Sequence, residues 1–270
     1  MEPRNEIPRF LSFNNLETGI KELIDNSGGV IIENLLSSED VSSIRKDLMN
    51  LINEERESGI LLDTDGSLRP RGVINILAER ILNLKKLIGL AEIVLGQFPV
   101  LSSFTANVVQ PGAKGQGMHR DYPYFSMPDK ISLSELPNLC VQAIIALDNF
   151  EIDNSPTLVI PGSHKENMWI PQEEFERLVV PVLMPLGSML LFHGAIAHGV
   201  APNKSDRERA AIILSFLPHW VRPFNDLITR TKPAILSLPG MDSLLGMDFK
   251  NRIRKDLSKM GFGMAKPGQK

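Results

Sequence analysis

The chain has 270 residues, of which 43% are hydrophobic and 23% charged, and its formal net charge at pH 7 is -3. This composition is ordinary for a globular protein and argues against wholesale disorder. The basic residues are scattered among acidic ones and form no stripe with interleaved aromatic residues, so we expect no nucleic-acid partner. The length fits one elaborated all-β barrel or sandwich, and we expect a single domain over residues 1–270.

Cysteine content and the N-terminal residues bear on the compartment. Cys140 is the only cysteine, which rules out an internal disulfide and fits a reducing environment. It lies in an apolar run, so we interpret it as a small buried hydrophobe and not as a reactive thiol. The first residues lack the apolar region of a secretory signal, and no apolar run reaches the ~20 residues of a membrane span. We therefore expect a cytoplasmic protein with no membrane partner; a homo-oligomer stays open.

The first hundred residues are predicted to be largely helical, with the helical part at about residues 37–98. A short strand is expected at residues 29–32. Ser37 is the expected cap of a helix whose first turn carries Glu39 and Asp40. A second helix is predicted over residues 76–98, with Gly96 as a stop signal.

After residue 100 the pattern changes to short β-rich runs separated by glycine and proline. The predicted strands are residues 105–109, 118–122, 140–147, 157–160, 189–192 and 210–217. Several strands without intervening helices indicate an antiparallel barrel or double sheet, here at about residues 100–220. Residues of about 255–270 are expected to form a C-terminal tail.

His119 and Asp121 are separated by one residue within a predicted strand. Side chains alternate along a strand, so positions i and i+2 emerge on one face and can converge on one ion. His198 would complete a set of two histidines and one carboxylate. Such a set leaves three positions of an octahedron vacant, which a non-haem Fe(II) oxygenase needs for a co-substrate and O₂.

The other histidines are interpreted differently. His164 lies in a Pro-Gly-Ser-His turn and is taken as structural. His193 competes with His198 for the third ligand position, but His193 ends an apolar run whereas His198 opens a turn before the next strand, and we prefer His198. His219 follows the last predicted strand and is taken as peripheral.

Arg209 opens the last predicted strand, eleven residues after His198. The residues that follow it are mostly apolar, so its guanidinium would project from a strand that belongs to the core. A buried arginine needs a partner, and its planar fork suits a carboxylate held at two points. That partner is either a protein carboxylate or the distal carboxylate of 2-oxoglutarate.

These motifs resemble the phytanoyl-CoA dioxygenase-like family of the Fe(II)/2-oxoglutarate-dependent oxygenases over residues 29–217. The matching residues are those at 119–125, 154–164 and 187–192, His198-Gly199 with Pro202-Asn203 and Ser205, and Arg209. The resemblance implies a double-stranded β-helix (jelly roll, cupin-like) packed by N-terminal helices. It also implies that His119, Asp121 and His198 bind Fe(II) and that Arg209 anchors 2-oxoglutarate.

The chain departs from the family pattern at Ser155, where a glycine is frequent, and at Val200, where a hydroxyl residue is frequent. A hydroxyl at position 200 would help to hold 2-oxoglutarate. Thr157 or Gln142 could supply that co-substrate contact instead. Alternatively, Thr157 is present only because threonine favours β-strands, and Gln142 is a buried core amide whose hydrogen bonds are all made within the protein.

The resemblance implies a dioxygenase that uses Fe(II), 2-oxoglutarate and O₂ to hydroxylate an unactivated C–H bond of a small metabolite or natural-product intermediate, releasing succinate and CO₂. Desaturation, epoxidation or cyclisation at the same site stays open. Candidate substrate contacts follow the ligand strand or lie in an expected lid: Tyr122, Tyr124, Phe125 and Trp169. Two other classes stay open, a cupin-like metal enzyme that uses no 2-oxo acid and a non-catalytic binding module.

Overall fold

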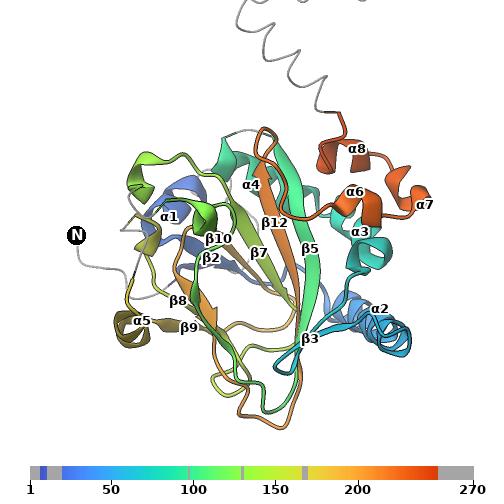
Figure 1. The fold of residues 1–270 in the computed structure, drawn as a ribbon, viewed down its shortest axis with the longest axis horizontal. Coiled ribbons are helices and arrows are strands. Elements are labelled where there is room, and N and C mark those ends of the chain that lie inside the picture. The colour runs from blue at the N-terminus through green and yellow to red at the C-terminus, as the bar shows by residue number, and fades with distance from the viewer. Residues whose placement is uncertain (1–6, 11–19, 97, 129–130, 166–169, 249–270) are drawn as a thin grey trace, which may run out of the picture.

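The computed structural model describes residues 7–10, 20–96, 98–128, 131–165 and 170–248. Within them the chain forms two β-sheets that face each other, with helices on the outside (Figure 1). The major sheet has eight strands. In spatial order they are β1 (Arg9–Phe10), β2 (Gly29–Ile32), β10 (Met189–His193), β7 (Val141–Ala146), β12 (Arg209–Pro218), β5 (Pro99–Val109), β4 (Ser67–Arg69) and β3 (Leu62–Thr64).

The minor sheet has four short strands, and it carries two of the predicted metal ligands at its edge. In spatial order they are β6 (Gln116–His119), β11 (His198–Val200), β8 (Thr157–Val159) and β9 (Val180–Val182). All pairings in this sheet are antiparallel. The antiparallel double sheet with flanking helices confirms the jelly-roll fold class expected from the sequence.

The helices of the described residues lie mainly on the side of the major sheet that faces away from the minor sheet (Figure 1). They are α1 (Ile20–Ser27), α2 (Ser38–Glu57), α3 (Val73–Asn83), α4 (Lys85–Leu95), α5 (Gln172–Leu178), α6 (Leu227–Arg230), α7 (Pro233–Leu236) and α8 (Met241–Leu244). Short 3₁₀ turns occur at Tyr124–Ser126, Leu133–Glu135 and Ser163–Lys165. The main hydrophobic core lies between these helices and the major sheet.

Successive side chains of a strand point to opposite faces of the sheet. In β7, β10 and β12 this alternation determines which side chains face the site. One set packs into the main core: Val141, Ala143, Ile145, Met189, Leu191, Ala210, Ile212, Leu214 and Phe216. The other set faces the minor sheet and includes Gln142, Ile144, Phe192, Ile213 and Ser215. Arg209 has the parity of Ile213 and Ser215, so it lies on the inner face as well.

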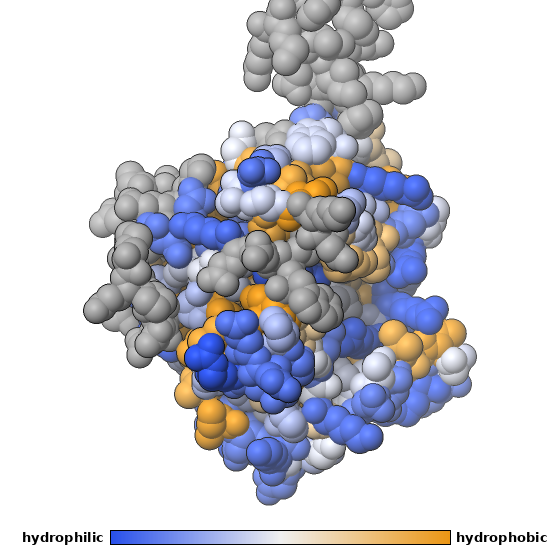
Figure 2. Space-filling view, turned by 60° about the vertical axis from the view of Figure 1, so that its left-hand side comes forward, coloured by the Kyte–Doolittle hydropathy of each residue, from blue (hydrophilic) through white to orange (hydrophobic). Residues whose placement is uncertain are grey.

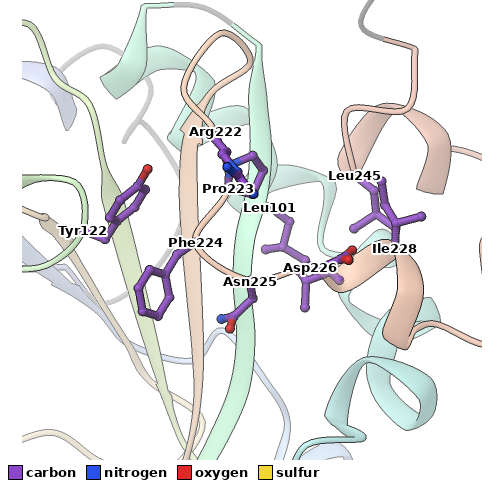
Figure 3. A pocket seen from close by; sticks show the side chains of 10 residues that line it. Leu101, Tyr122, Arg222, Pro223, Phe224, Asn225, Asp226, Ile228 and Leu245 are labelled. Carbon is purple, nitrogen blue, oxygen red and sulfur yellow. The ribbon is translucent and has the colours of Figure 1, made fainter.

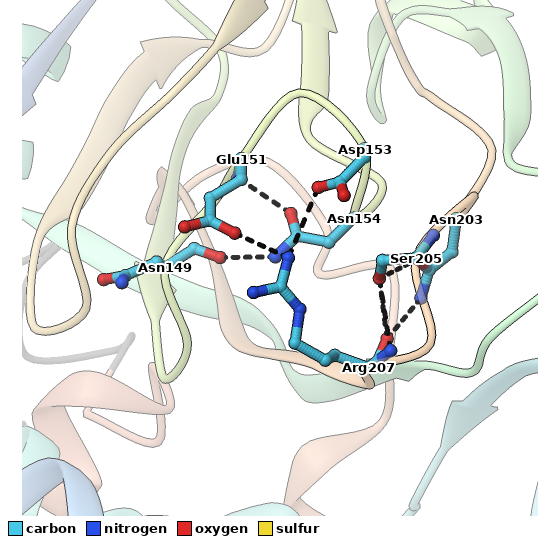
Figure 4. Close-up of polar contacts among 7 residues, drawn as sticks. All are labelled: Asn149, Glu151, Asp153, Asn154, Asn203, Ser205 and Arg207. Atoms are coloured by element: carbon cyan, nitrogen blue, oxygen red, sulfur yellow. Dashed lines mark hydrogen bonds and ion pairs between the residues drawn. The ribbon is translucent and has the colours of Figure 1, made fainter.

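Two loops that precede the site strands are tied together by polar contacts (Figure 4). Asn154 donates to the carbonyl of Asn149 (2.7 Å) and accepts from the backbone N–H of Glu151 (2.8 Å). Arg207 forms an ion pair with Glu151 (2.7 Å), and Asn203 donates to the carbonyl of Arg207 (2.7 Å). These bonds fix the entries to β8 and β12, and therefore the positions of the residues that those strands carry into the site.

Several expected elements are confirmed, and others differ. The strand predicted over residues 105–109 begins earlier, at Pro99, and the part expected to be helical contains the strands β3 and β4. Ser37 accepts a hydrogen bond from the backbone N–H of Asp40 (3.1 Å) and caps α2 as expected. The helix predicted over residues 76–98 is instead two helices, which meet at Leu84 and of which the second ends at Gly96. The strand predicted over residues 118–122 ends at His119, because the chain turns there and Asp121 donates its backbone N–H to Gly194. The tail at about residues 255–270 lies outside the described residues, and the single domain stays a prediction.

The described residues show neither a membrane-spanning helix nor, on the face drawn in Figure 2, one continuous apolar surface. No helix within the described residues has both the length and the apolar character needed to cross a bilayer. On the face shown in Figure 2, hydrophilic residues dominate and apolar residues form separate patches.

Candidate metal centre and its cavity

His119, Asp121 and His198 come together at the edge of the minor sheet. Each offers one ligand atom, and these three atoms all lie within 4.8 Å of one another. His119 and His198 are register partners on the antiparallel strands β6 and β11, and their ring centroids are 4.1 Å apart. Nε2 of His198 lies 3.5 Å from Oδ2 of Asp121. The structure therefore brings together the three residues that the sequence predicts as iron ligands.

Backbone carbonyls orient both imidazoles. Nδ1 of His119 lies 3.1 Å from the carbonyl oxygen of Gly117, and Nδ1 of His198 lies 3.0 Å from that of Ile196. A carbonyl only accepts, so each Nδ1 carries the proton and donates. Each Nε2 is then left with a lone pair, which is the form in which histidine binds a metal.

Burial shifts the pKa of each group in the direction that suits a bound cation. It lowers the pKa of His119 to about 4, with a further decrease from neighbouring His198, and it lowers the pKa of His198 to about 4. Both rings are therefore neutral at pH 7. Burial raises the pKa of Asp121 to about 6, against the opposing effect of His119. A divalent cation would supply the positive charge that this buried carboxylate lacks.

Asp121 has one oxygen that is free for a ligand. Gln142 of β7 donates a hydrogen bond to its carboxylate, which also opposes the increase in its pKa. Oδ2 of Asp121 is buried and has no hydrogen-bond partner among the described residues. A buried carboxylate oxygen without a partner is costly unless an ion occupies the site. Two neutral Nε2 atoms and one unpartnered carboxylate oxygen fit a divalent iron ion.

The three residues belong to the wall of a cavity of about 380 Å³ between the two sheets. Of the other predicted site residues, four also line it: Gln142, Thr157, Tyr122 and Phe125. Thr157 is buried on β8, which pairs with β11, the strand that carries His198. Val200, where the family frequently has a hydroxyl, lines the cavity too. The cavity therefore has room for a co-substrate beside the ligands, within the ordinary size range of small-molecule sites.

Arg209 is buried at the start of β12 but is not among the residues that line this cavity. Its guanidinium lies over the ring of Phe150 (4.4 Å to the centroid) and donates to the carbonyl of Ser155 (2.8 Å). Burial lowers its pKa to about 10, so it is charged at pH 7. Among the described residues no carboxylate pairs with it within 4.0 Å, and its Nε has no hydrogen-bond partner. It thus keeps donor capacity for a carboxylate from outside the protein.

Tyr124 does not line the cavity, and we do not retain it as a substrate contact. It is 1% exposed, and its hydroxyl accepts from the backbone N–H of Leu139 (2.8 Å). The 3₁₀ turn sends Tyr124 into a core cluster and Phe125 to the cavity side. Trp169 lies outside the described residues.

The remaining buried histidines take structural positions, as expected for His164. Its Nε2 donates to the carbonyl of Asp25 (3.1 Å), and its ring lies 5.1 Å from that of His193. His193 contacts Oδ1 of Asn138 through Nε2 (2.6 Å) and stacks near Tyr124. Neither belongs to the ligand cluster, so His193 does not displace His198 there.

Arg69 and Phe224 are among the cavity residues that were not predicted from the sequence. Arg69 of β4 lines the cavity, and its Nε is buried without a hydrogen-bond partner among the described residues. The sequence does contain an indication of the strand that carries Arg69. Asp65-Gly66 is typical of a two-residue β-hairpin turn and predicts the hairpin of β3 and β4. Phe224 also lines the cavity, from the segment after β12. No sequence motif marks it.

Comparison with known proteins agrees with this geometry. A family model described as "Phytanoyl-CoA dioxygenase (PhyH)" matches residues 24–211. The match covers more than half of the chain and includes all three candidate ligands and Arg209. The chain belongs to the phytanoyl-CoA dioxygenase family, and its curated relatives are dioxygenases.

Individual relatives are more distant. "Dioxygenase FUM3" of Gibberella moniliformis is 32% identical over 127 residues, which are 46% of this chain and 40% of the relative. The chain spans less than half of the length of the first curated relatives it matches.

Two solved structures share the fold. The carbocyclase SnoK from nogalamycin biosynthesis has a TM-score of 0.64 at 19% identity, covering 84% of this chain and 95% of that one. HygX from Streptomyces hygroscopicus, with nickel and 2-oxoglutarate bound, has a TM-score of 0.62 at 17% identity, covering 78% and 90%.

Proposed function

We propose that the protein is an Fe(II)- and 2-oxoglutarate-dependent dioxygenase that hydroxylates an unactivated C–H bond of a small metabolite or natural-product intermediate. The observation that carries the proposal is the convergence of His119, Asp121 and His198 on one point in the wall of a cavity. Bound there, iron would supply the coupling of 2-oxoglutarate decarboxylation, giving succinate and CO₂, to oxidation of the substrate by O₂.

The protein's own contribution begins with the ligands. The carbonyls of Gly117 and Ile196 hold the two imidazoles in the tautomer in which Nε2 carries no proton. Gln142 orients the carboxylate of Asp121 from a strand of the major sheet. Outer contacts of this kind fix ligand geometry and raise metal affinity. Two histidines and one carboxylate leave half of an octahedral sphere for the co-substrate and O₂.

Carboxylate groups of the co-substrate need cationic partners, and two arginines are available. Arg209 is the buried anchor of the co-substrate, because its guanidinium is charged and incompletely hydrogen-bonded on the inner face of the major sheet.

 Thr157 lies on the neighbouring strand β8 and offers a hydroxyl in place of the one that Val200 lacks. Arg69 is a second cation and faces the cavity directly. A carboxylate held at two points by a guanidinium is fixed in orientation as well as in place.

Desaturation, epoxidation and cyclisation are alternative reactions for this site, since they need the same metal ligands and the same co-substrate. A cupin-like metal enzyme without a 2-oxo acid would use the three ligands but not Arg209. A non-catalytic binding module would have no use for the ligand set. The unpartnered Oδ2 of Asp121 and the incompletely partnered Arg209 favour the 2-oxoglutarate-dependent enzyme over both.

The test is the Fe(II)-dependent conversion of 2-oxoglutarate to succinate by the purified protein, measured first without a prime substrate and then with a broad metabolite pool. We expect succinate to form and its formation to be abolished by His119→Ala or Asp121→Ala. Ser43→Ala, on an exposed position of α2, serves as the matched control and should retain the wild-type rate. The absence of succinate from the iron-loaded wild-type protein with every pool tested would overturn the proposal.

A further inference from the structure

Three aromatic side chains meet at the cavity that contains the metal ligands, and we name Tyr122, Phe125 and Phe224 the aromatic rim. Their ring centroids are 5.4 Å (Tyr122–Phe224), 5.9 Å (Tyr122–Phe125) and 6.0 Å (Phe125–Phe224) apart. All three line the cavity, yet Phe125 is 56% exposed and Phe224 is 60% exposed. Clustered, exposed apolar side chains at a cavity are typical of a surface that binds an apolar ligand.

The position of Phe224 is fixed by its backbone. Its N–H donates to the hydroxyl of Ser102 (2.8 Å), and the N–H of Asn225 donates to the carbonyl of Ser102 (3.1 Å). The side chain of Asn225 donates to the hydroxyl of Ser103 (3.0 Å). The segment that carries Phe224 is therefore bound to β5, and the exposed ring is held beside the cavity by three hydrogen bonds.

A second cavity, of about 470 Å³, adjoins the rim (Figure 3). Tyr122 and Phe224 line both cavities, so these two rings are a shared wall. The lining of the second cavity includes the apolar residues Leu101, Ile228 and Leu245 as well as the charged residues Arg222 and Asp226. A molecule too large for the metal-site cavity can therefore cross the rim and place its remote part here.

The charges of the lining restrict the class of molecule. Among the described residues that line the metal-site cavity, Asp121 is the only acidic one, and its carboxylate is a candidate iron ligand. Arg69 adds a positive charge to the same wall. A polycationic substrate would find no carboxylate to pair with beside the metal site, whereas a hydrocarbon skeleton would bury the exposed rings of the rim.

We propose that the substrate is a bulky molecule with a mainly hydrocarbon skeleton, which packs on the aromatic rim and extends into the second cavity, and that Phe224 determines this specificity. The inference rests on the proposed function, because it takes the occupant of the cavity to be the molecule that is oxidised. It adds a residue and a second cavity to the site, and it assigns a chemical class to the substrate.

The test uses a fluorescent probe with a bulky hydrocarbon skeleton, bis-ANS (4,4′-dianilino-1,1′-binaphthyl-5,5′-disulfonate), which is titrated into the full chain. We expect one probe per chain. Phe224→Ala should weaken binding at least tenfold, and Phe224→Leu, which keeps an apolar side chain, should weaken it less. Ile228→Asn, which places a polar group in the second cavity, should weaken binding at least threefold. Trp220→Ala is the matched control, since Trp220 is 53% exposed and lines neither cavity, and its affinity should stay within twofold of the wild type.

Equal affinity of the wild-type and Phe224→Ala proteins would overturn the role of the rim, and equal affinity of Ile228→Asn would overturn the extension into the second cavity. All of the altered side chains are more than one third exposed, so the variants are expected to fold, and thermal unfolding checks that they do. The readout needs neither iron, 2-oxoglutarate nor turnover. Failure of this inference is therefore distinguishable from failure of the succinate assay that tests the proposed function.

Discussion

His119 and His198 are 79 positions apart in the chain and lie directly opposite each other on the antiparallel strands β6 and β11. Directly opposed side chains of an antiparallel pair are the closest neighbours that a sheet provides. The register of this one pairing therefore decides whether the two imidazoles can share an ion. Asp121 joins them from the turn just after β6, where its backbone N–H is bound to Gly194.

Gln142 is expected to support metal binding through Asp121. Gln142→Leu removes the hydrogen-bond donor to the carboxylate of Asp121 and leaves the volume of the side chain nearly unchanged. Loss of an outer hydrogen bond to a ligand typically costs 10–100-fold in metal affinity, so we expect a decrease of about that size for Ni(II), measured by titration calorimetry. Ser215→Ala is the control, because Ser215 lines the same cavity but does not contact Asp121. Equal affinity of the Gln142→Leu and wild-type proteins would contradict this role.

Arg209 is expected to set the affinity for 2-oxoglutarate. Arg209→Lys keeps the charge but loses the planar fork, and a charge-assisted hydrogen bond contributes about 1.5–3 kcal/mol. We therefore expect the KM for 2-oxoglutarate to rise at least tenfold, measured by succinate release. Arg69→Lys provides the comparison, because Arg69 lines the metal-site cavity. A rise in KM for Arg69→Lys alone, with none for Arg209→Lys, would transfer the anchoring role to Arg69.

Stability is expected to fall as the pH drops below 6.5, partly because of His164. Burial lowers its pKa from 6.5 to about 4, so between these values the unfolded chain binds a proton that the folded protein does not. Each such proton contributes a slope of about 1.4 kcal/mol per pH unit. His164→Gln should reduce the slope of the unfolding free energy between pH 6 and pH 4.5 by up to about that amount, measured by urea denaturation. An identical slope for the variant would show that His164 does not contribute.

Ser37 is expected to stabilise α2 without affecting the site. Its side chain accepts from the backbone N–H of Asp40, and removal of such a cap typically costs about 1 kcal/mol. Ser37→Ala should lower the free energy of unfolding by about that amount and leave succinate formation unchanged. Ser42→Ala, at an exposed position inside the same helix, should be neutral or slightly stabilising, because alanine favours helices. A Ser37→Ala protein as stable as the wild type would contradict the capping role.

The sequence predicted the β-rich half of the fold because its strands combine apolar runs with glycine and proline turns. The positions of β10 and β12 agree with their predicted ranges to within one residue at each end. The break between α3 and α4 at Leu84 was not predictable from pattern, since neither glycine nor proline marks it and apolar residues continue across it. Helix boundaries of this kind are decided by packing against the sheet.

His119 and Asp121 were predictable because they form a local His-x-Asp motif, and His198 because it opens a turn before the next strand. The rest of the cavity depends on tertiary structure. Gln142 reaches Asp121 only because β7 lies in the major sheet with that residue on its inner face. Phe224 reaches the cavity because its segment is bound to Ser102, more than one hundred residues earlier in the chain. Tyr124 and Phe125 are neighbours in sequence, and a single 3₁₀ turn sends one to the core and the other to the cavity.

Metal binding by the purified protein, freed of metal and titrated anaerobically with Fe(II) in a calorimeter, tests the central claim most directly. The geometry predicts one ion per chain for the wild type and at least a hundredfold loss of affinity in His119→Ala, Asp121→Ala and His198→Ala alike. Equal binding of Fe(II) by the wild-type and His198→Ala proteins would contradict a site shared by the three residues.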